Sequence, residues 1–239
     1  MPERGAGSSV ASSAADGRRT RWDAHRVRRR EQIVRAALEV LAEAGPEFGL
    51  EQVAARAGIS KPVVYRYYSD RAGLVAAMGE RATAMLLERI VPALQADVAV
   101  LPRIRMSVGA FLAFADESPN VYRLLTRHAP DGGAGVARTA EEIVARVLAA
   151  VLVDAVPQLD LDAGVVEVWA HGVIGFVQKT TEWWLEQRTV TRDELTDRLT
   201  TLVWAQIDGL GRHHGVALDP DRRPARRPDL RYPAFTVLS

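Results

Sequence analysis

The residue types best suited to chemistry in this sequence gather between positions 61 and 68. They are Lys61, Val63, Tyr65, Arg66, Tyr67 and Tyr68. Ammonium, guanidinium and phenol groups donate hydrogen bonds to phosphate oxygens or base edges, and apolar side chains pack on a thymine methyl. This set therefore favours recognition of double-stranded DNA over the making or breaking of bonds.

The residues around this set have the pattern of two short helices joined by a sharp turn. Gly58 stands where the turn needs a residue that tolerates positive φ. Ser60 can cap the second helix, and Pro62 falls in its first turn, where a missing N–H costs little. The buried frame of such a unit would be Val53, Ala54, Ala57, Ile59 and Val64. Residues 50–71 thus predict a helix-turn-helix whose basic and aromatic face points outward, as a major-groove reader requires.

The rest of the sequence also has helical periodicity. A helix is expected from about Arg26 until Gly45-Pro46 ends it, and Asp70 is expected to cap a helix that runs to about Val91. Further helices are expected over 102–116, 119–128, 136–155, 162–187 and 192–213, the last behind a capping box at Thr191. No segment alternates with a period of two, so the predicted fold class is all-α.

Charge is distributed unevenly along the 239 residues. The net charge is only +1, but residues 1–71 carry 13 Lys or Arg against 9 Asp or Glu, and residues 72–239 carry 18 against 21. A basic N-terminal region followed by a slightly acidic remainder suggests that the N-terminal region binds a polyanion. The alternative is a solvated tail whose charge has no binding role. No apolar run reaches about 18 residues and no secretory signal is evident, so we expect a cytoplasmic protein with no membrane partner.

Catalysis, metal binding and cofactor binding have little support in the sequence. There is no cysteine, and the five histidines show no metal-ligating spacing. No nucleophile elbow, P-loop or dinucleotide-binding motif is present. We therefore expect no enzyme activity, no metal and no cofactor.

The sequence resembles the TetR family of bacterial transcriptional regulators. The resemblance is carried by REQIVRAALEVLAEAG, by LEQVAARAGISKPVVYRYYSDRAGLVAAM, and by the succession of later helices. It implies a three-helix DNA-binding domain over 26–71 and a larger helical ligand-binding and dimerisation domain over 72–213. A disordered basic arm over 1–25 and a Pro/Arg-rich tail over 214–239 would flank them.

The family implies a homodimer whose two recognition helices enter successive major grooves of a pseudo-palindromic operator. By position, Lys61, Pro62 and Val63 would approach base edges, and Tyr65, Tyr67 and Arg71 would contact phosphates. The sequence departs from the family at Gly49-Leu50, where a hydroxyl residue often opens the second helix. A phosphate bond from that point is in doubt, although the helix N–H groups could replace it.

The expected effector site lies among the helices of the second domain. The candidate ligand-binding residues are Phe111, Phe114, Tyr122, Trp169, His171 and Phe176, with His128 and Gln178 as further polar groups. The same aromatic residues could instead form ordinary core, and a lone histidine is more often a core residue than a ligand contact. The apolar character of the set favours a small hydrophobic effector.

The last two long helices are the expected dimer interface. Gly172 and Gly175 would leave a flat spot where a partner helix approaches closely. Trp183, Trp184 and Trp204 supply large apolar area of the kind enriched at interfaces, with intrachain core as the alternative.

The sequence thus predicts an effector-responsive DNA-binding regulator, a repressor released from its operator by a small molecule. A helical protein-interaction module with a vestigial DNA-binding motif is the alternative. The arginines before residue 31 could form an arm that reaches along DNA, or a solvated tail.

Overall fold

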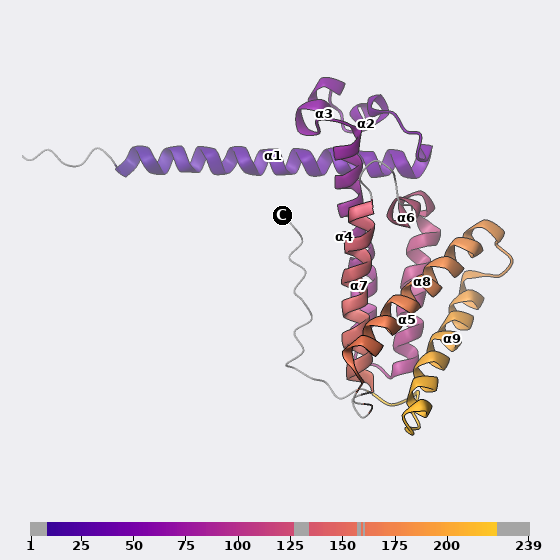
Figure 1. Ribbon diagram of the computed structural model, residues 1–239. Helices are drawn as coiled ribbons and strands as arrows, with labels where there is room; N and C mark the ends of the chain where they lie inside the picture. Colours follow the sequence, from indigo (N-terminus) through magenta and orange to yellow (C-terminus); the bar gives the residue numbers. More distant parts are fainter. Residues whose placement is uncertain (1–8, 127–133, 157–158, 160, 224–239) are drawn as a thin grey trace, which may run out of the picture. The chain divides into compact units, whose positions relative to one another are not determined.

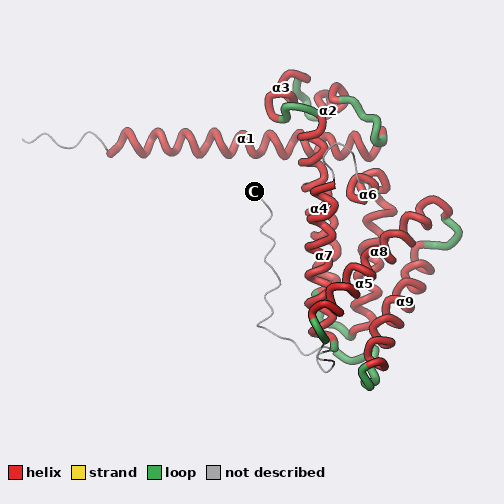
Figure 2. The backbone as a smooth tube through the Cα atoms, viewed as in Figure 1, coloured by secondary structure: helices red, strands yellow, loops and turns green. Residues whose placement is uncertain are grey.

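The computed structural model describes residues 9–126, 134–156, 159 and 161–223 (Figure 1). Within these ranges the helices are α1 (Ser9–Ala44), α2 (Leu50–Arg56), α3 (Lys61–Tyr67), α4 (Arg71–Leu94), α5 (Val100–Glu117), α6 (Pro119–Thr126), α7 (Ala134–Ala155), α8 (Ala163–Gln187) and α9 (Arg192–His213). The described residues contain no strand, which confirms the predicted all-α class (Figure 2).

Two helix boundaries differ from the sequence-based prediction by more than two residues. Helix α1 begins at Ser9, well before Arg26, although its first part was expected to be a disordered arm. That part is rich in alanine and arginine, which favour helix, but it has no apolar stripe for a periodicity search to find. Helix α4 continues past Pro92, which lies in its last turn, where the lost hydrogen bond disturbs few residues.

The chain divides into two compact units between Leu74 and Val75. In the first unit α2 packs against both α1 and α3. The fully buried side chains Ile33, Val53 and Val64 form its centre. Gly58, with φ of 64°, makes the turn between α2 and α3, so the conformation expected from the sequence is present.

In the second unit α5 packs against α9, and α7 packs against α8. Val173 of α8 and Val203 of α9 are buried in one apolar cluster with Leu152 of α7. Trp184 is also core, because it is 2 % exposed and its indole nitrogen donates to the carbonyl of Val190 at 2.8 Å. For Trp184 the intrachain alternative is therefore the one observed.

The segment after α9 lies on the second unit as an ordered strap, residues 214–223. Gly215 turns the chain with φ of 73°. The carbonyls of Pro220 and Arg222 then accept hydrogen bonds from the N–H groups of Leu101 and Val100, at 3.1 and 3.3 Å. These N–H groups belong to the first turn of α5, which has no partner for them inside the helix. The strap therefore caps α5.

None of the described helices is long and apolar enough to cross a membrane.

Candidate nucleic-acid interface and internal cavity

Helix α3 presents the polar and aromatic face that the sequence predicts. Val64 is 1 % exposed and holds the helix to its unit, whereas Tyr65 is 45 % exposed. Pro62 is exposed and lies in the first turn of α3. Ser60 occupies the N-cap position, but its side chain makes no capping hydrogen bond. Its hydroxyl is therefore not committed to capping α3.

Lys61 is held by an acid of the preceding helix. Its ammonium donates to a carboxylate oxygen of Glu51, in the first turn of α2, across the turn of the helix-turn-helix. This hydrogen bond lowers the pKa of the Glu51 carboxyl and raises the pKa of the Lys61 ammonium. Sequence reasoning missed the pair, because the two residues are ten positions apart and meet only when the turn forms.

Arg71 is also partly engaged within its own unit. Its guanidinium donates to the carbonyl of Pro46 at 2.7 Å and lies 4.9 Å from the ring centre of Phe48. A guanidinium has five N–H donors, so donors remain for a phosphate. Asp70 caps α4 as predicted, with its carboxylate 2.7 Å from the N–H of Gly73.

The two tyrosines at the end of α3 have different environments. Tyr68 is 4 % exposed, its hydroxyl donates to the carbonyl of Arg30 at 3.3 Å, and the Arg30 guanidinium covers its ring. Tyr67 is half-buried, with the Arg66 guanidinium 5.5 Å from its ring centre. Tyr68 is thus structural, and Tyr67 shares the outer face with Arg66.

The start of α2 shows what replaces the missing hydroxyl residue. The N–H of Gly49 donates to the side-chain oxygen of Gln52 at 2.8 Å, and Glu51 places a carboxylate in the same turn. A carboxylate there already complements the positive end of the helix dipole. At the other end of α2, Arg56 ion-pairs with Glu39 and Glu43 of α1 and so ties the two helices together.

The second unit contains a cavity of about 100 Å³ among α4, α5, α6, α7 and α8. Leu86, Ile90 and Leu94 of α4 form one wall, and the other four helices add mostly apolar side chains. Tyr122 lines it, with its ring edge-on to Phe111 at 5.8 Å and its hydroxyl donating to the carbonyl of Gln178 at 3.3 Å. Burial raises the pKa of the Tyr122 hydroxyl, so this group stays protonated and acts as a donor.

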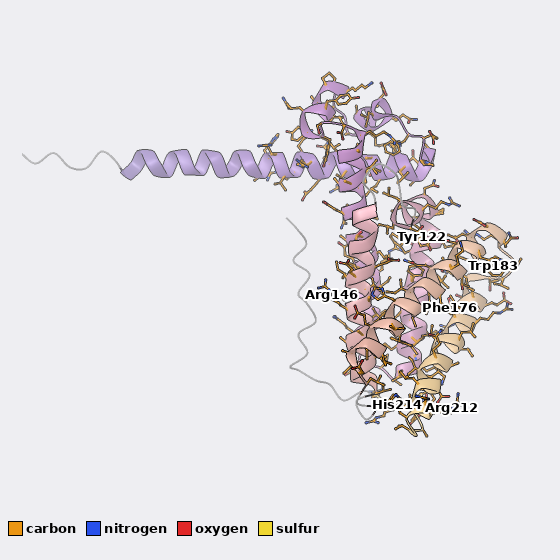
Figure 3. The ribbon with its side chains drawn as sticks, in the orientation of Figure 1. Tyr122, Arg146, Phe176, Trp183, Arg212 and His214 are labelled. Carbon is orange, nitrogen blue, oxygen red and sulfur yellow. The ribbon has the colours of Figure 1, made fainter. Side chains whose placement is uncertain are left out.

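The structure separates the six residues proposed from sequence to bind a ligand. Phe111 and Tyr122 line the cavity. Phe114 is core at 1 % exposure, and His171 is exposed. Phe176, labelled on α8 in Figure 3, packs against the apolar clusters of the unit. Trp169 lines a different feature, described next. Gln178 lines the cavity, and His128 lies outside the described residues.

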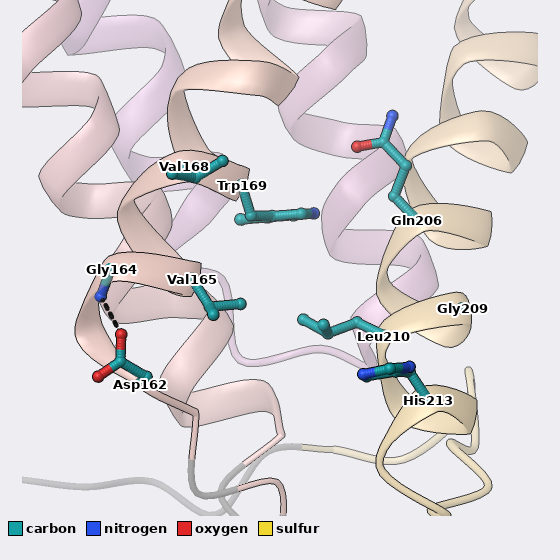
Figure 4. Close-up of a pocket in the computed structure, with 9 residues that line it drawn as sticks. All are labelled: Asp162, Gly164, Val165, Val168, Trp169, Gln206, Gly209, Leu210 and His213. Atoms are coloured by element: carbon teal, nitrogen blue, oxygen red, sulfur yellow. Dashed lines mark hydrogen bonds between the residues drawn. The ribbon is translucent and has the colours of Figure 1, made fainter.

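A groove runs between the start of α8 and the end of α9 (Figure 4). Val165 and Leu210 face each other across it, and the indole of Trp169 extends from α8 toward α9. The Trp169 indole nitrogen is buried without a hydrogen-bond partner among the described residues. Periodicity could not separate this groove from the cavity, because both are lined by α8.

No group of three or more His, Asp or Glu side chains in the described part of the chain is arranged to hold a metal ion.

Comparison with known proteins agrees with this geometry. Residues 33–78 match the family described as bacterial regulatory proteins, tetR family, and residues 89–217 match the family described as tetracyclin repressor-like, C-terminal domain. An uncharacterized HTH-type transcriptional regulator of Mycobacterium tuberculosis H37Rv is 32 % identical over 82 % of this chain and 84 % of its own length. The HTH-type transcriptional activator FasR of Mycolicibacterium smegmatis is 27 % identical over 75 % of this chain and 83 % of its own.

Solved structures give the same result at the level of the fold. A tetR-family transcriptional regulator from Streptomyces coelicolor matches with a TM-score of 0.63 at 24 % identity, over 79 % of this chain and 85 % of that one. AibR, in complex with isovaleryl coenzyme A and operator DNA, matches with a TM-score of 0.55 at 16 % identity, over 73 % and 97 %. This chain belongs to the TetR family of bacterial transcriptional regulators, which bind DNA and are not a class of enzyme.

Proposed function

We propose that the protein is a homodimeric repressor that leaves its operator when a small, largely apolar effector enters the cavity. The observation that carries the proposal is the continuity of α4. Its first residue, Arg71, contacts Pro46 in the helix-turn-helix unit, and its later residues Leu86, Ile90 and Leu94 line the cavity. A ligand that displaces these side chains acts on the same helix that supports the DNA-binding unit.

DNA recognition is assigned to the outer face of α3. Lys61 can donate to guanine, and Pro62 and Val63 can pack on a thymine methyl. Tyr65, Tyr67 and Arg71 are assigned to phosphates, since exposed hydroxyl and guanidinium groups donate there without reading sequence. Lys61 must exchange its Glu51 partner for a base edge as the complex forms.

Dimerisation is assigned to the outer face of α8 and α9. Val168 is 75 % exposed, Trp183 is 47 % exposed, and Leu202 of α9 is 50 % exposed. On the same side of α8, a Cβ atom at Gly172 or Gly175 would meet nothing within 4 Å in this chain. These glycines therefore have no packing role inside the subunit, and a flat apolar face of this kind suits close contact with a second copy.

The effector would act by linkage. The two half-sites of an operator are roughly 34–36 Å apart, so the two recognition helices must keep a matching separation to bind both. A ligand releases DNA only if it binds more tightly to a conformation in which this separation is wrong. The cavity of about 100 Å³ is smaller than a drug-sized pocket of roughly 300–1,000 Å³, so an effector must move the walls that it contacts. The solved neighbour AibR, whose structure holds isovaleryl coenzyme A and operator DNA, supports a small acyl group as one class of effector.

The sign of regulation is proposed to be negative, in line with the repressor-like family that matches residues 89–217. The relative FasR is described as an activator, so a promoter-reporter assay with and without the gene is the measurement that decides. Higher reporter output without the protein is expected. Lower output without it would make the protein an activator.

The DNA-binding part is tested by fluorescence anisotropy on DNA from upstream of the protein's own gene, at several salt concentrations. Salt-sensitive binding is expected. Tyr65→Phe and Tyr67→Phe should weaken binding to all sequences, whereas Lys61→Ala should also lose about 1–3 kcal/mol of discrimination at one base pair. If no promoter fragment binds, the vestigial-motif alternative replaces this proposal.

A further inference from the structure

A buried arginine lies on the same face of α5 as the cavity lining. Arg103, Ser107 and Phe111 are spaced by four residues, so they follow one another on successive turns of α5. Ser107 and Phe111 line the cavity, and Arg103 lies one turn beyond them. Arg103 is 7 % exposed, which is unusual for a cation.

The Arg103 guanidinium has few partners. It makes one long hydrogen bond, from Nη2 to the carbonyl of Val98 at 3.4 Å. Its Nε is buried with no acceptor, and no carboxylate of the described residues ion-pairs with it. An arginine stays charged at physiological pH, and a buried charge is costly unless an anion or several acceptors surround it.

The polar side chains that line the cavity do not supply that anion to Arg103. The hydroxyl of Ser107 donates back to the carbonyl of Arg103 at 2.8 Å, and the hydroxyl of Thr126 donates to the carbonyl of Tyr122 at 3.3 Å. Glu141 is the one acid that lines the cavity, and it comes from α7. The cavity thus has an apolar body, and a buried, under-coordinated cation lies one helical turn from Ser107, outside the lining itself.

We propose that the cavity takes a short-chain carboxylate, whose hydrocarbon part fills the apolar space and whose carboxylate pairs with Arg103. This inference rests on the proposed function and names the chemical class of the effector. A cavity of about 150 Å³ holds benzene, so about 100 Å³ fits a skeleton of roughly four carbons, and a longer chain must displace the cavity walls. The flexible Arg103 side chain turns from the Val98 carbonyl toward Ser107, exchanging one long hydrogen bond for a bidentate ion pair.

The short hydrocarbon chain that fills the cavity could belong to a free acid or to an acyl group carried on coenzyme A. In a thioester the carboxylate is lost, and the anionic phosphates lie far from the acyl chain. A free carboxylate therefore requires Arg103, whereas a thioester whose acyl group enters the cavity does not.

The test is calorimetric titration of the full-length protein with hexanoate, 1-hexanol and hexanoyl coenzyme A, on the natural chain and on Arg103→Met. The natural chain should bind hexanoate at least 10-fold more tightly than hexanol. Arg103→Met should reduce this ratio to about 1 and leave hexanol binding unchanged. Arg105→Gln, which alters an exposed arginine of the same helix that pairs with Asp197, is the matched control and should keep the ratio.

The thermal stability of the ligand-free protein separates a ligand role from a structural one. If Arg103 awaits an anion, replacing it by an apolar chain of similar length should raise Tm, by roughly 2–4 °C. If Arg103 instead holds the turn at Val98, Arg103→Met should lower Tm and the inference fails. Arg103→Lys keeps the cation and should retain part of the preference for hexanoate.

Three binding results would also overturn the inference, and each has a different consequence for the proposed effector. Equal binding of hexanoate and hexanol removes the carboxylate and leaves the cavity as the effector site. Binding of hexanoyl coenzyme A alone, unchanged in Arg103→Met, makes the thioester the effector class. Binding of none of the three, in protein that still binds its operator, also removes the proposed apolar effector.

Discussion

Glu51 and Lys61 form an ion pair that joins the first turn of α2 to the first residue of α3. Both side chains are exposed enough to exchange partners. The pair therefore places a negative charge beside the lysine that is proposed to read the operator. DNA must compete with Glu51 for Lys61, and its phosphates must approach a carboxylate.

The first prediction concerns Glu51→Gln. Removing the carboxylate releases Lys61 and lessens repulsion of phosphates, so affinity should rise a few-fold for specific and nonspecific DNA. The slope of log affinity against log salt should steepen, because the surface that meets the phosphates then carries one negative charge fewer. Fluorescence anisotropy from low to moderate salt measures both quantities. Glu80→Gln, an exposed acid on α4 with the same change in charge, is the control, and equal slopes in the two variants would contradict the prediction.

The second prediction concerns acid sensitivity of the contact between α1 and α2. The hydrogen bond from Arg56 lowers the pKa of the Glu43 carboxyl below its ordinary value of 4.5. A lowered pKa in the folded state means that the ionised form is stabilised, so the contribution is complete above about pH 4.5 and is lost as the pH falls through the folded pKa. Glu43→Gln should therefore lower Tm at pH 7 and have little effect at pH 3.

Thermal unfolding followed by circular dichroism at several pH values checks this, with Glu47→Gln as the control. Glu47 is exposed on the same unit, and its substitution should leave Tm unchanged at every pH. A Glu43→Gln effect that persists undiminished at pH 3 would exclude the ion pair as its cause.

The third prediction concerns the proposed dimer face. Gly175→Gln adds a side chain that meets nothing inside the subunit, and glutamine favours helix by roughly 0.5–1 kcal/mol relative to glycine. The subunit should fold normally, but the partner helix can no longer approach closely, so the dimer should dissociate at higher protein concentration. Sedimentation velocity over a concentration series measures this. Unchanged dimerisation in Gly175→Gln would place the interface elsewhere.

The fourth prediction concerns the strap that follows α9. A Cβ atom at Gly211 would lie 2.7 Å from Cγ of Leu218 and 3.0 Å from the carbonyl oxygen of Val216. Gly211→Ala should therefore destabilise the protein by about 1–3 kcal/mol, despite the better helix propensity of alanine. Leu218→Ala removes the side chain that the new Cβ atom would meet first. Gly211→Ala should therefore destabilise the Leu218→Ala protein less than it destabilises the natural chain.

Urea denaturation of the four proteins of this cycle gives the coupling between the two sites. Gly109→Ala is the control within a helix, because its added Cβ would meet only Thr196 at an ordinary 3.6 Å. Additive effects of Gly211→Ala and Leu218→Ala would show that the strap does not pack on α9 in solution.

Local patterns in the sequence determined the helix-turn-helix and most helix boundaries. Gly58, Pro62 and the capping box at Thr191 act through their own backbone and near neighbours, so their types and spacing were sufficient. The same holds for the outward position of Tyr65, which follows the buried Val64 in the helical periodicity of α3. The family followed from this stretch as well.

Contacts between residues far apart in the chain were decided only by the tertiary structure. Periodicity marks an apolar face, but it does not say whether that face meets core, cavity or groove, and so Phe114, Trp169 and Phe176 could not be separated from Phe111 and Tyr122. The partner of Lys61, the burial of Arg103 and the strap over α5 likewise depend on which helices come together. Local patterns set the backbone and the chemistry of each helix, whereas packing set which side chains face DNA, an effector or a second subunit.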